Sequence, residues 1–316
     1  MQFVTKKTSE LTNTDWDQLT DLYNATFKRN VESEYFKKKY NSSVPSISCF
    51  HGFMVDDAIG IVGAMTIIPF KYEFFEKNVI FGNLIDLMIN ANYRTNILNF
   101  KLIYDQLLKN INSKVDFIYA VPNPNSHLYF TKILQWKEIG KLNYYLFPVK
   151  ITKLLKLVSS FDKLIRPFNN LFQLLFSRNR QKLFHPSISK IISHNFLNYR
   201  YSDSYKSFTI GGQTAWYRIY NENGVVTCYI IDIEPMDRKW MAKSIASIYK
   251  LERENVDVIM YVSNNKAGAF NILKTPVKFE PRNLPLIGKV INTKNIDNRI
   301  FNLSNWRFNL SDFDVR

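Results

Sequence analysis

Asp86 is the residue whose surroundings point most directly to chemistry. It lies in the run NLIDLMI (83–89), whose other members are nearly all apolar. A carboxylate in such a run costs free energy unless something compensates its charge. The compensation is either a bound substrate, which the carboxylate orients or deprotonates, or a structural Lys or Arg. The sequence leaves both interpretations open.

A second group of polar side chains follows a predicted buried strand, DFIYAVP (116–122). Asn123, Asn125 and Ser126 come directly after it, where loops often carry binding residues. The same residue types also suit the N-terminus of the helix expected next, so a capping role stays open. The four histidines lack the spacing of a metal site, and no P-loop or dinucleotide-binding glycine pattern occurs. We therefore expect no metal.

The composition limits the class of protein. The 316 residues suffice for about two domains, and an apolar content of 46% allows a sizeable core. The 42 basic residues exceed the 27 acidic ones, which gives a net charge of +15. Such a charge favours polyanionic partners, although a basic surface also serves solubility. Two cysteines, no secretory signal and no long apolar run predict a cytoplasmic protein without a disulfide framework.

The hydrophobic pattern repeats along the chain, which predicts an α+β protein with one domain type used twice. EYFKKKY (34–40) has a counterpart in NFLNYRY (195–201), and residues 238–265 repeat the pattern of 94–123. The strand pair predicted at 214–235 mirrors the pair at 52–69. The predicted elements of the first half are helices near 14–23, 34–40, 100–111 and 125–134, and strands near 49–55, 59–68, 72–75, 78–90, 116–122 and 141–148.

The stretch between the two halves has its own composition. Residues 150–190 hold nine basic residues and one acid, with apolar residues at helical spacing and a break at Pro167. A basic amphipathic helix of this kind lies on an anionic membrane surface or packs its apolar stripe on a domain. We therefore expect an N-terminal domain at 1–149, a basic helical linker at 150–194 and a C-terminal domain at 195–316.

Several segments resemble the GNAT superfamily of CoA-dependent N-acyltransferases. They are EYFKKKY, DDAIGIVGAMTIIP, GNLIDLMINANYR, FIYAVPNPNSHLYFTKILQWKEIG and, in the second half, FLNYRY. More narrowly, the chain is similar to the tandem-GNAT sugar N-acyltransferases of bacterial surface-polysaccharide and lipopolysaccharide biosynthesis, the group that serves the anthrose pathway. The resemblance implies two GNAT-like domains, each a mixed, mostly antiparallel sheet flanked by helices. It also implies transfer of an acyl group from acyl-CoA to the amino group of a nucleotide-linked amino-deoxy sugar.

The resemblance assigns a site for coenzyme A in the first domain. In the GNAT fold the strand written here LIDLMIN splays from FIYAVP, and backbone groups at Met88 and Asn90 would bind the pantetheine arm. The residues of the pyrophosphate loop and its surroundings would be Arg94, Thr95, Asn96, Ile97, Asn99 and Asn123. Both glycines of the family motif R-x-x-G-x-G/A are absent here. Their absence weakens the expected binding of pyrophosphate, because a Cβ obstructs its close approach to the backbone.

The resemblance also gives roles to residues around the substrate. Asp86 matches the family's aspartate and would bind the sugar amine or accept its proton. The other substrate-binding residues would be Asn83, Asn125, Ser126 and Arg200. In many GNATs a tyrosine after this strand protonates the leaving thiolate, but that position is Phe130 here. Either Tyr129 replaces it as the catalytic acid, or the thiolate takes the proton of the amine directly.

Two other functions stay open. A Fem-type tandem GNAT would take its acyl group from aminoacyl-tRNA, with residues 150–190 on the RNA phosphates. A non-catalytic pseudo-acyltransferase would use the same residues to bind a membrane or a protein partner, and the missing glycines favour it. We do not expect DNA as a partner. The predicted location is the cytoplasm, with a peripheral contact to an anionic membrane through 150–190 left open.

Overall fold

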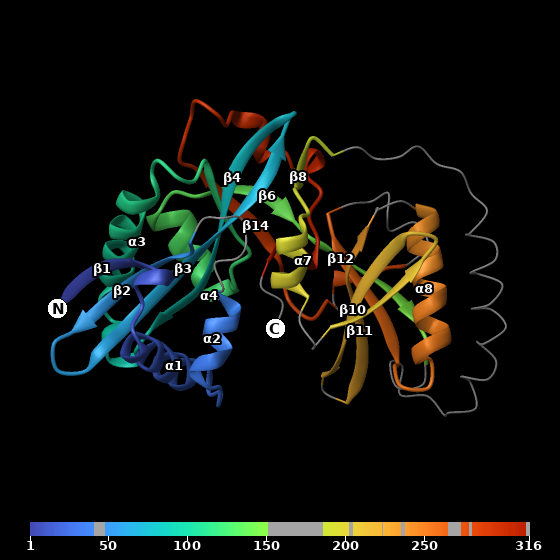
Figure 1. Ribbon diagram of the computed structural model, residues 1–316, viewed down its shortest axis with the longest axis horizontal. Coiled ribbons are helices and arrows are strands. Elements are labelled where there is room, and N and C mark those ends of the chain that lie inside the picture. Colours follow the sequence, from blue (N-terminus) through green and yellow to red (C-terminus); the bar gives the residue numbers. More distant parts are fainter. Residues whose placement is uncertain are drawn as a thin grey trace. The chain divides into compact units, whose positions relative to one another are not determined.

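The structure is a computed structural model that describes residues 1–40, 48–150, 186–201, 205–222, 224–234, 238–264, 273–277 and 280–313. Residues 151–185, which hold most of the basic helix expected in the linker, lie outside the described residues. The chain forms two compact units, and neither is one continuous stretch of sequence (Figure 1). The first unit comprises Met1–Gly140, Ser187–Arg200 and Pro285–Asn302, and the second comprises Lys141–Pro186, Tyr201–Leu284 and Leu303–Arg316.

The first unit is built on a sheet of eight described strands. Their order is β1 (Gln2–Lys7), β2 (Phe50–Asp56), β3 (Gly60–Phe74), β4 (Lys77–Ile89), β5 (Phe117–Ala120), β14 (Pro285–Val290) and β6 (Lys137–Lys141), with β8 (Ile188–Lys190) pairing beside β3. β4 and β5 run parallel, and the pairings from β1 to β4 and between β5 and β14 are antiparallel. A parallel pair needs a crossover connection, and helix α3 (Ile97–Ile111) provides it.

Helices cover both faces of this sheet. α3 carries Phe100, Ile103 and Leu107 on one stripe and packs them in an apolar cluster with Met65 and Ile67 of β3. Side chains alternate along a strand, so the side chain of Thr66, between Met65 and Ile67, points to the opposite face of the sheet. Helices α1 and α2 lie on that face (Figure 1). The remaining helical segments of the unit are α1 (Asn13–Phe27), α2 (Ser33–Lys39), α4 (Pro124–Leu128), the π-helical turn Tyr129–Ile133, α7 (His194–Arg200) and the short turns Thr8–Glu10, Ala91–Tyr93 and Asn298–Phe301.

The second unit repeats this plan on a smaller scale. Its six described strands follow the order β13 (Leu273–Lys274), β7 (Asn143–Pro148), β12 (Val258–Ser263), β11 (Val225–Glu234), β10 (Gln213–Glu222) and β9 (Lys206–Ile210). β11 and β12 run parallel and are connected by α8 (Arg238–Glu252), which buries Met241, Ile245 and Ile248 against the sheet. Two short turns, Leu303–Asn305 and Leu310–Asp312, close the unit. The expected fold class, a mixed α+β chain with two sheets flanked by helices, is confirmed.

The two units exchange a strand. β7 follows the first half of the sequence but pairs with β12 in the second unit, and β14 follows the second half but pairs with β5 in the first. Each strand occupies the position next to the shorter parallel strand of its sheet. The exchange explains why the units do not coincide with contiguous halves of the chain.

Two aspartates with equivalent backbone contacts fix how the two units correspond. Asp116 at the start of β5 accepts the N–H of Ile80 at 2.9 Å, and Asp257 at the start of β12 accepts the N–H of Val226 at 2.8 Å. When these two contacts are taken as equivalent, β11 corresponds to β4, and β10 corresponds to β3. The repeat of helix and strand at 94–123 and 238–265 is therefore correct, but 214–235 corresponds to β3 and β4 and not to 52–69.

Candidate active site

The central feature of the first unit is the place where β4 and β5 part. They pair only at Phe81–Phe117, Gly82–Ile118 and Asn83–Tyr119, although β4 continues to Ile89. Among the described residues, no hydrogen bond or ion pair joins residues 84–89 to residues 120–123. Leu84 and Ala120 belong to the apolar cluster that α3 covers. The parting that the GNAT resemblance implies is present, with α3 on one side of the gap.

The backbone register decides which groups of β4 face the gap. The N–H of Asn90, expected to bind the pantetheine arm, donates to Val62 of β3 at 2.8 Å. Because successive peptide groups of a strand point in opposite directions, the groups of Ile89 face the gap instead. The Ile89 carbonyl accepts the side chain of Arg94 at 2.7 Å (Nε to O). Met88 is buried and pairs with Ala64 of β3.

Asp86 lies on a β-bulge, three residues beyond the last β4–β5 pair. Its φ of 50° lies in the left-handed region, and the pairing of β3 with β4 shifts register between Ala64 and Thr66. Asp adopts this conformation more readily than most residues, and a bulge changes the direction of the side chain. The local backbone therefore turns the Asp86 side chain out of the regular alternation of β4.

The carboxylate of Asp86 is held by the residues at the end of α2. Lys39 Nζ lies 2.8 Å from Asp86 Oδ2, and the hydroxyl of Tyr40 donates to the same oxygen. The side chains of Lys39 and Asp86 are 11% and 8% exposed, and Tyr40 is fully buried. Burial and then the charge of Asp86 raise the pKa of Tyr40 well above its usual value, so its hydroxyl stays a donor. The sequence left open whether a bound substrate or a structural Lys or Arg compensates the charge of Asp86. The structure contains a structural lysine, Lys39, at this carboxylate.

The environment of Tyr40 continues inward through a buried histidine. The rings of Tyr40 and His51 meet edge to face with centroids 4.9 Å apart. His51 Nδ1 lies 3.0 Å from Thr66 Oγ1, and His51 Nε2 lies 2.9 Å from Thr8 Oγ1. Burial lowers the pKa of His51 to about 3, so the ring is neutral at physiological pH. Sequence analysis missed Lys39, Tyr40 and His51, although the first two lie in the quoted EYFKKKY segment.

The loop expected to bind pyrophosphate is built without glycine. Asn96 caps α3 by accepting the N–H of Leu98 at 3.0 Å, and Asn99 Nδ2 donates to the carbonyl of Tyr93 at 3.0 Å. Arg94, Thr95, Asn96 and Ile97 are exposed. In the described part of the chain, Arg94 has no acidic partner. One N–H group of the loop, that of Leu98, is already bonded to Asn96, so fewer backbone donors remain there for a phosphate than in the family's glycine-rich cradle.

The residues after β5 mainly order their own helix. Asn123 caps α4, and its side chain accepts the N–H of Ser126 at 2.9 Å and the hydroxyl of Ser126 at 3.1 Å. Asn125 is exposed on the first turn. Tyr129 begins the π-helical turn, a geometry frequent at functional sites, and its ring lies 5.3 Å from that of Phe100. Phe130 is buried core.

Two further expected residues lie apart from this loop. Asn83 is buried and forms the last β4–β5 pair, so its side chain is at the base of the gap. Arg200 is the last residue of α7, which belongs to the first unit. Both positions remain predictions for substrate binding.

The corresponding place in the second unit is closed. β11 and β12 pair from Thr227–Val258 to Ile230–Tyr261, and beyond the last pair residues 307–309 bond to both strands. Asn309 Nδ2 donates to Asp232 of β11 at 2.8 Å, and the backbone of Asn309 forms a β-bridge with Ser263 of β12. Arg307 donates to the carbonyl of Ile233 at 3.1 Å. The tail segment, as we call residues 303–313, therefore bridges the two strands of the second unit at the place where no bond joins the described residues of β4 and β5 in the first.

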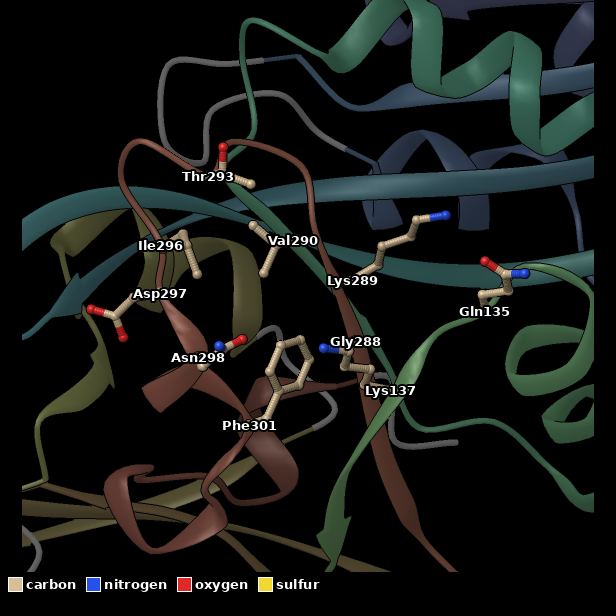
Figure 2. A pocket seen from close by; sticks show the side chains of 10 residues that line it. All are labelled: Gln135, Lys137, Gly288, Lys289, Val290, Thr293, Ile296, Asp297, Asn298 and Phe301. Carbon is tan, nitrogen blue, oxygen red and sulfur yellow. The ribbon is translucent and has the colours of Figure 1, made fainter.

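A separate cavity of about 490 Å³ lies in the first unit, against β14 and the residues that follow it (Figure 2). Its lining includes Lys137, Asn298 and Phe301, and the Lys137 ammonium lies 5.0 Å from the centre of the Phe301 ring. No residue assigned a role from the sequence lines it. The described residues contain no cluster of three metal-ligating side chains and no helix long and apolar enough to cross a membrane.

Comparison with known proteins identifies the fold. No family model and no curated protein sequence matches the chain significantly. Among solved structures, a protein of unknown function from Enterococcus faecalis V583, described as a probable N-acyltransferase, is 12% identical, with a TM-score of 0.55 over 93% of this chain and 74% of that one. A GCN5-related N-acetyltransferase from Anabaena variabilis ATCC 29413 is 13% identical, with a TM-score of 0.57 over 92% and 73%.

A third structure agrees with these two. A GCN5-related N-acetyltransferase from Kribbella flavida is 9% identical, with a TM-score of 0.57 over 92% of this chain and 71% of that one. At such identities the likeness shows the fold alone. The fold is that of the GCN5-related N-acetyltransferases, or GNATs, over nearly the whole chain.

Proposed function

We propose that the chain is an acyl-CoA-dependent N-acyltransferase whose acceptor is the amino group of a nucleotide-linked amino-deoxy sugar. The observation that carries the proposal is that β4 and β5 stop pairing beyond Asn83 and Tyr119, with the bulge at Asp86 beside this parting. Acyl transfer requires an amine held against a thioester carbonyl and a place for the carrier of the acyl group. The gap would take the carrier arm, and Asp86 would orient the amine.

The chemistry needs little from the chain beyond positioning. The amine nitrogen bonds to the acyl carbon, the carbon–sulfur bond breaks, and the proton lost by nitrogen goes to sulfur. Tyr129 is the side chain proposed to carry that proton, and direct transfer is the alternative. Ile89 would contact the carrier through its backbone groups, which face the gap. Arg94, whose Nε donates to the Ile89 carbonyl, would contact the carrier beside it.

The nucleotide-linked sugar is the finer part of the proposal. The net charge of +15 suits two ligands that each carry pyrophosphate. Asn83, Asn125, Ser126 and Arg200 are the proposed contacts of the sugar nucleotide. The reaction would serve surface-polysaccharide assembly in the cytoplasm.

Thermal shift and thiol release test the proposal together. Acetyl-CoA should raise the Tm, since a ligand that binds the native state stabilises it, whereas ADP at the same concentration should raise it less. Free thiol should appear when acetyl-CoA and UDP-glucosamine are both present, and not when UDP-glucose, the matched control without an amine, replaces UDP-glucosamine. Absence of a Tm change with acetyl-CoA together with absence of thiol release would refute the proposal.

A second candidate rests on the phosphate loop. The N–H of Leu98 is already bonded to Asn96, which removes part of a pyrophosphate site, and a Fem-type transferase that uses aminoacyl-tRNA needs no such site. It predicts binding of aminoacyl-tRNA that weakens steeply with salt, and no Tm response to acetyl-CoA. Filter binding of labelled aminoacyl-tRNA at 50 and 200 mM salt distinguishes the two candidates.

A further inference from the structure

Asp86 and Asp232 occupy equivalent positions in the two units. Each lies six residues beyond a backbone N–H, that of Ile80 or of Val226, which donates to the aspartate at the start of the next parallel strand, Asp116 or Asp257. Each also accepts a tyrosine hydroxyl on Oδ2: Tyr40 on Asp86, and Tyr201 on Asp232 at 3.1 Å. The two tyrosines are the final residues of the repeated segments EYFKKKY and NFLNYRY. The same carboxylate–tyrosine pair is therefore built twice.

The other carboxylate oxygen distinguishes the two sites. Asp232 Oδ1 accepts the side-chain amide of Asn309 at 2.8 Å and the N–H of Ile233 at 3.0 Å. Asp86 Oδ1 has no hydrogen-bond partner among the described residues. The Asp86 side chain retains 8% exposure, so a small group can reach it. In the second unit, where the tail segment bridges the strands, Asn309 thus shows how a nitrogen donor binds Oδ1 of the equivalent aspartate, Asp232.

The charge at both sites is already balanced. Lys39 Nζ lies 2.8 Å from Asp86 Oδ2, and Arg307 Nη2 lies 3.5 Å from Asp232 Oδ1. A neutral ion pair attracts a second cation only weakly, and a largely buried place penalises an unpaired charge. In the second unit the donor that completes the site is a neutral amide. The same electrostatics at Asp86 disfavour an ammonium group and admit an uncharged N–H donor.

We infer that Asp86 Oδ1 accepts an N–H of the acceptor amine in its uncharged form, and that Lys39 and Tyr40 are positioning residues that fix Oδ2. The inference rests on the proposed acyl transfer and names the acceptor class: weakly basic amines. An amine with the pKa of an α-amino group is about one third uncharged at pH 7.5, whereas a lysine-like amine is uncharged in about one molecule per thousand. The uncharged amine is also the nucleophile, and the proton that it loses goes to sulfur. Asp86 therefore stays ionised throughout the reaction and takes up no proton.

Amine selectivity tests the role of Lys39. We compare kcat/KM for glucosamine and for cadaverine at pH 7.5, with acetyl-CoA as the acyl donor and thiol release as the signal. The wild-type chain should prefer glucosamine. Lys39→Gln leaves the carboxylate charge unbalanced, so the preference should fall at least tenfold, and Lys39→Arg should restore it. An unchanged preference in Lys39→Gln would overturn the inference.

The repeated pair supplies a matched control. Tyr40→Phe should raise the KM for glucosamine about tenfold with a smaller change in kcat, because the amine binds Oδ1 of the carboxylate whose Oδ2 Tyr40 holds in place. Tyr201→Phe removes the same hydroxyl from the closed site and should change neither constant. Equal kinetics of the two variants would contradict the positioning role. The Tm of each variant without ligand verifies folding, and the conservative Lys39→Arg and Tyr40→Phe variants keep the test valid if Lys39→Gln unfolds.

Amine binding without turnover gives an independent readout. Glucosamine alone should raise the Tm of the wild-type chain and of Tyr201→Phe, but not that of Asp86→Asn. Absence of thiol release with either amine, together with no Tm shift by acetyl-CoA, would refute the proposed acyl transfer and with it this inference. Thiol release with unaltered selectivity in Lys39→Gln refutes the inference alone.

Discussion

The two units differ most at the place where their parallel strands part. In the first unit the gap beyond Asn83 and Tyr119 is free of crossing hydrogen bonds among the described residues. In the second unit the tail segment bonds to both strands, through Asn309 to Asp232 and Ser263. The same carboxylate–tyrosine pair is thus built into both units, and the difference lies in what bonds to the parting strands beside it. Under the proposed acyl transfer, this difference decides which of the two carboxylates binds the amine.

The largest expected difference comes from the same substitution made in each unit. Asp86→Asn should lower kcat/KM for amine acetylation at least 100-fold while the Tm shift by acetyl-CoA persists. The single amide oxygen stays with the donors Lys39 and Tyr40, so the NH2 group replaces the oxygen that accepts from the amine. Asp232→Asn should leave the rate unchanged and lower the free energy of unfolding by about 3 kcal/mol, because Arg307 loses its buried partner. Steady-state kinetics and urea unfolding of both variants measure this. Equal effects on rate would remove the functional distinction between the units.

The tail segment gives the next largest effect. Asn309→Ala removes the donor to Asp232 and the acceptor for the N–H of Ser311, both buried, and should cost about 2 kcal/mol of unfolding free energy. The stoichiometry of acetyl-CoA binding should remain one per chain, because Trp306 and Phe308 still fill the second unit. Calorimetric titration measures the stoichiometry. A second bound acetyl-CoA in this variant would show that Asn309 alone keeps the second site closed.

Acid should affect the first unit through His51. Its folded pKa of about 3 lies below the unfolded value of about 6.5, so the unfolded chain binds the extra proton between these values. Stability is therefore complete above pH 6.5 and falls as the pH drops toward 3, by about 2 kcal/mol between pH 7.5 and pH 5. His51→Gln should lose less stability over this interval in urea unfolding. An identical loss in both proteins would show that His51 does not control the acid response.

The smallest expected effect concerns the phosphate loop. Arg94→Gln should weaken CoA binding about tenfold, since a guanidinium without an acidic partner is available to a phosphate. Arg253→Gln is the matched control, because Arg253 is an exposed arginine paired with Glu254 in the second unit. Calorimetric titration compares the two. An unchanged affinity in Arg94→Gln would remove Arg94 from the proposed site.

The sequence predicts the helices and strands of this chain better than it predicts which strands pair with each other. α3 was expected at 100–111 and is found at Ile97–Ile111, because its apolar stripe has a clear helical period. β3 runs unbroken through Pro69 to Phe74, although separate strands were expected at 59–68 and 72–75. The exchange of β7 and β14 was not predicted, since local periodicity does not specify which distant strand lies alongside.

For the candidate site, the sequence likewise predicts the central residue but not the residues that contact it. Asp86 was recognised because a carboxylate in an apolar run is costly, and the structure supplies its lysine. Tyr40 and Lys39 were within a quoted repeat, yet their contact with Asp86 depends on a bulge that the sequence does not mark. The tail segment could not be foreseen, because its contacts with β11 and β12 join residues far apart in the chain.

Hydrogen exchange with and without acetyl-CoA tests the central claim most directly. If the carrier arm lies in the first gap, backbone amides in residues 84–94 become protected when acetyl-CoA binds, while those in residues 230–234 do not change. The second unit serves as the internal control, since its gap is already filled. Protection at 230–234, or no protection at 84–94 at a concentration that raises the Tm, would contradict an open donor site in the first unit.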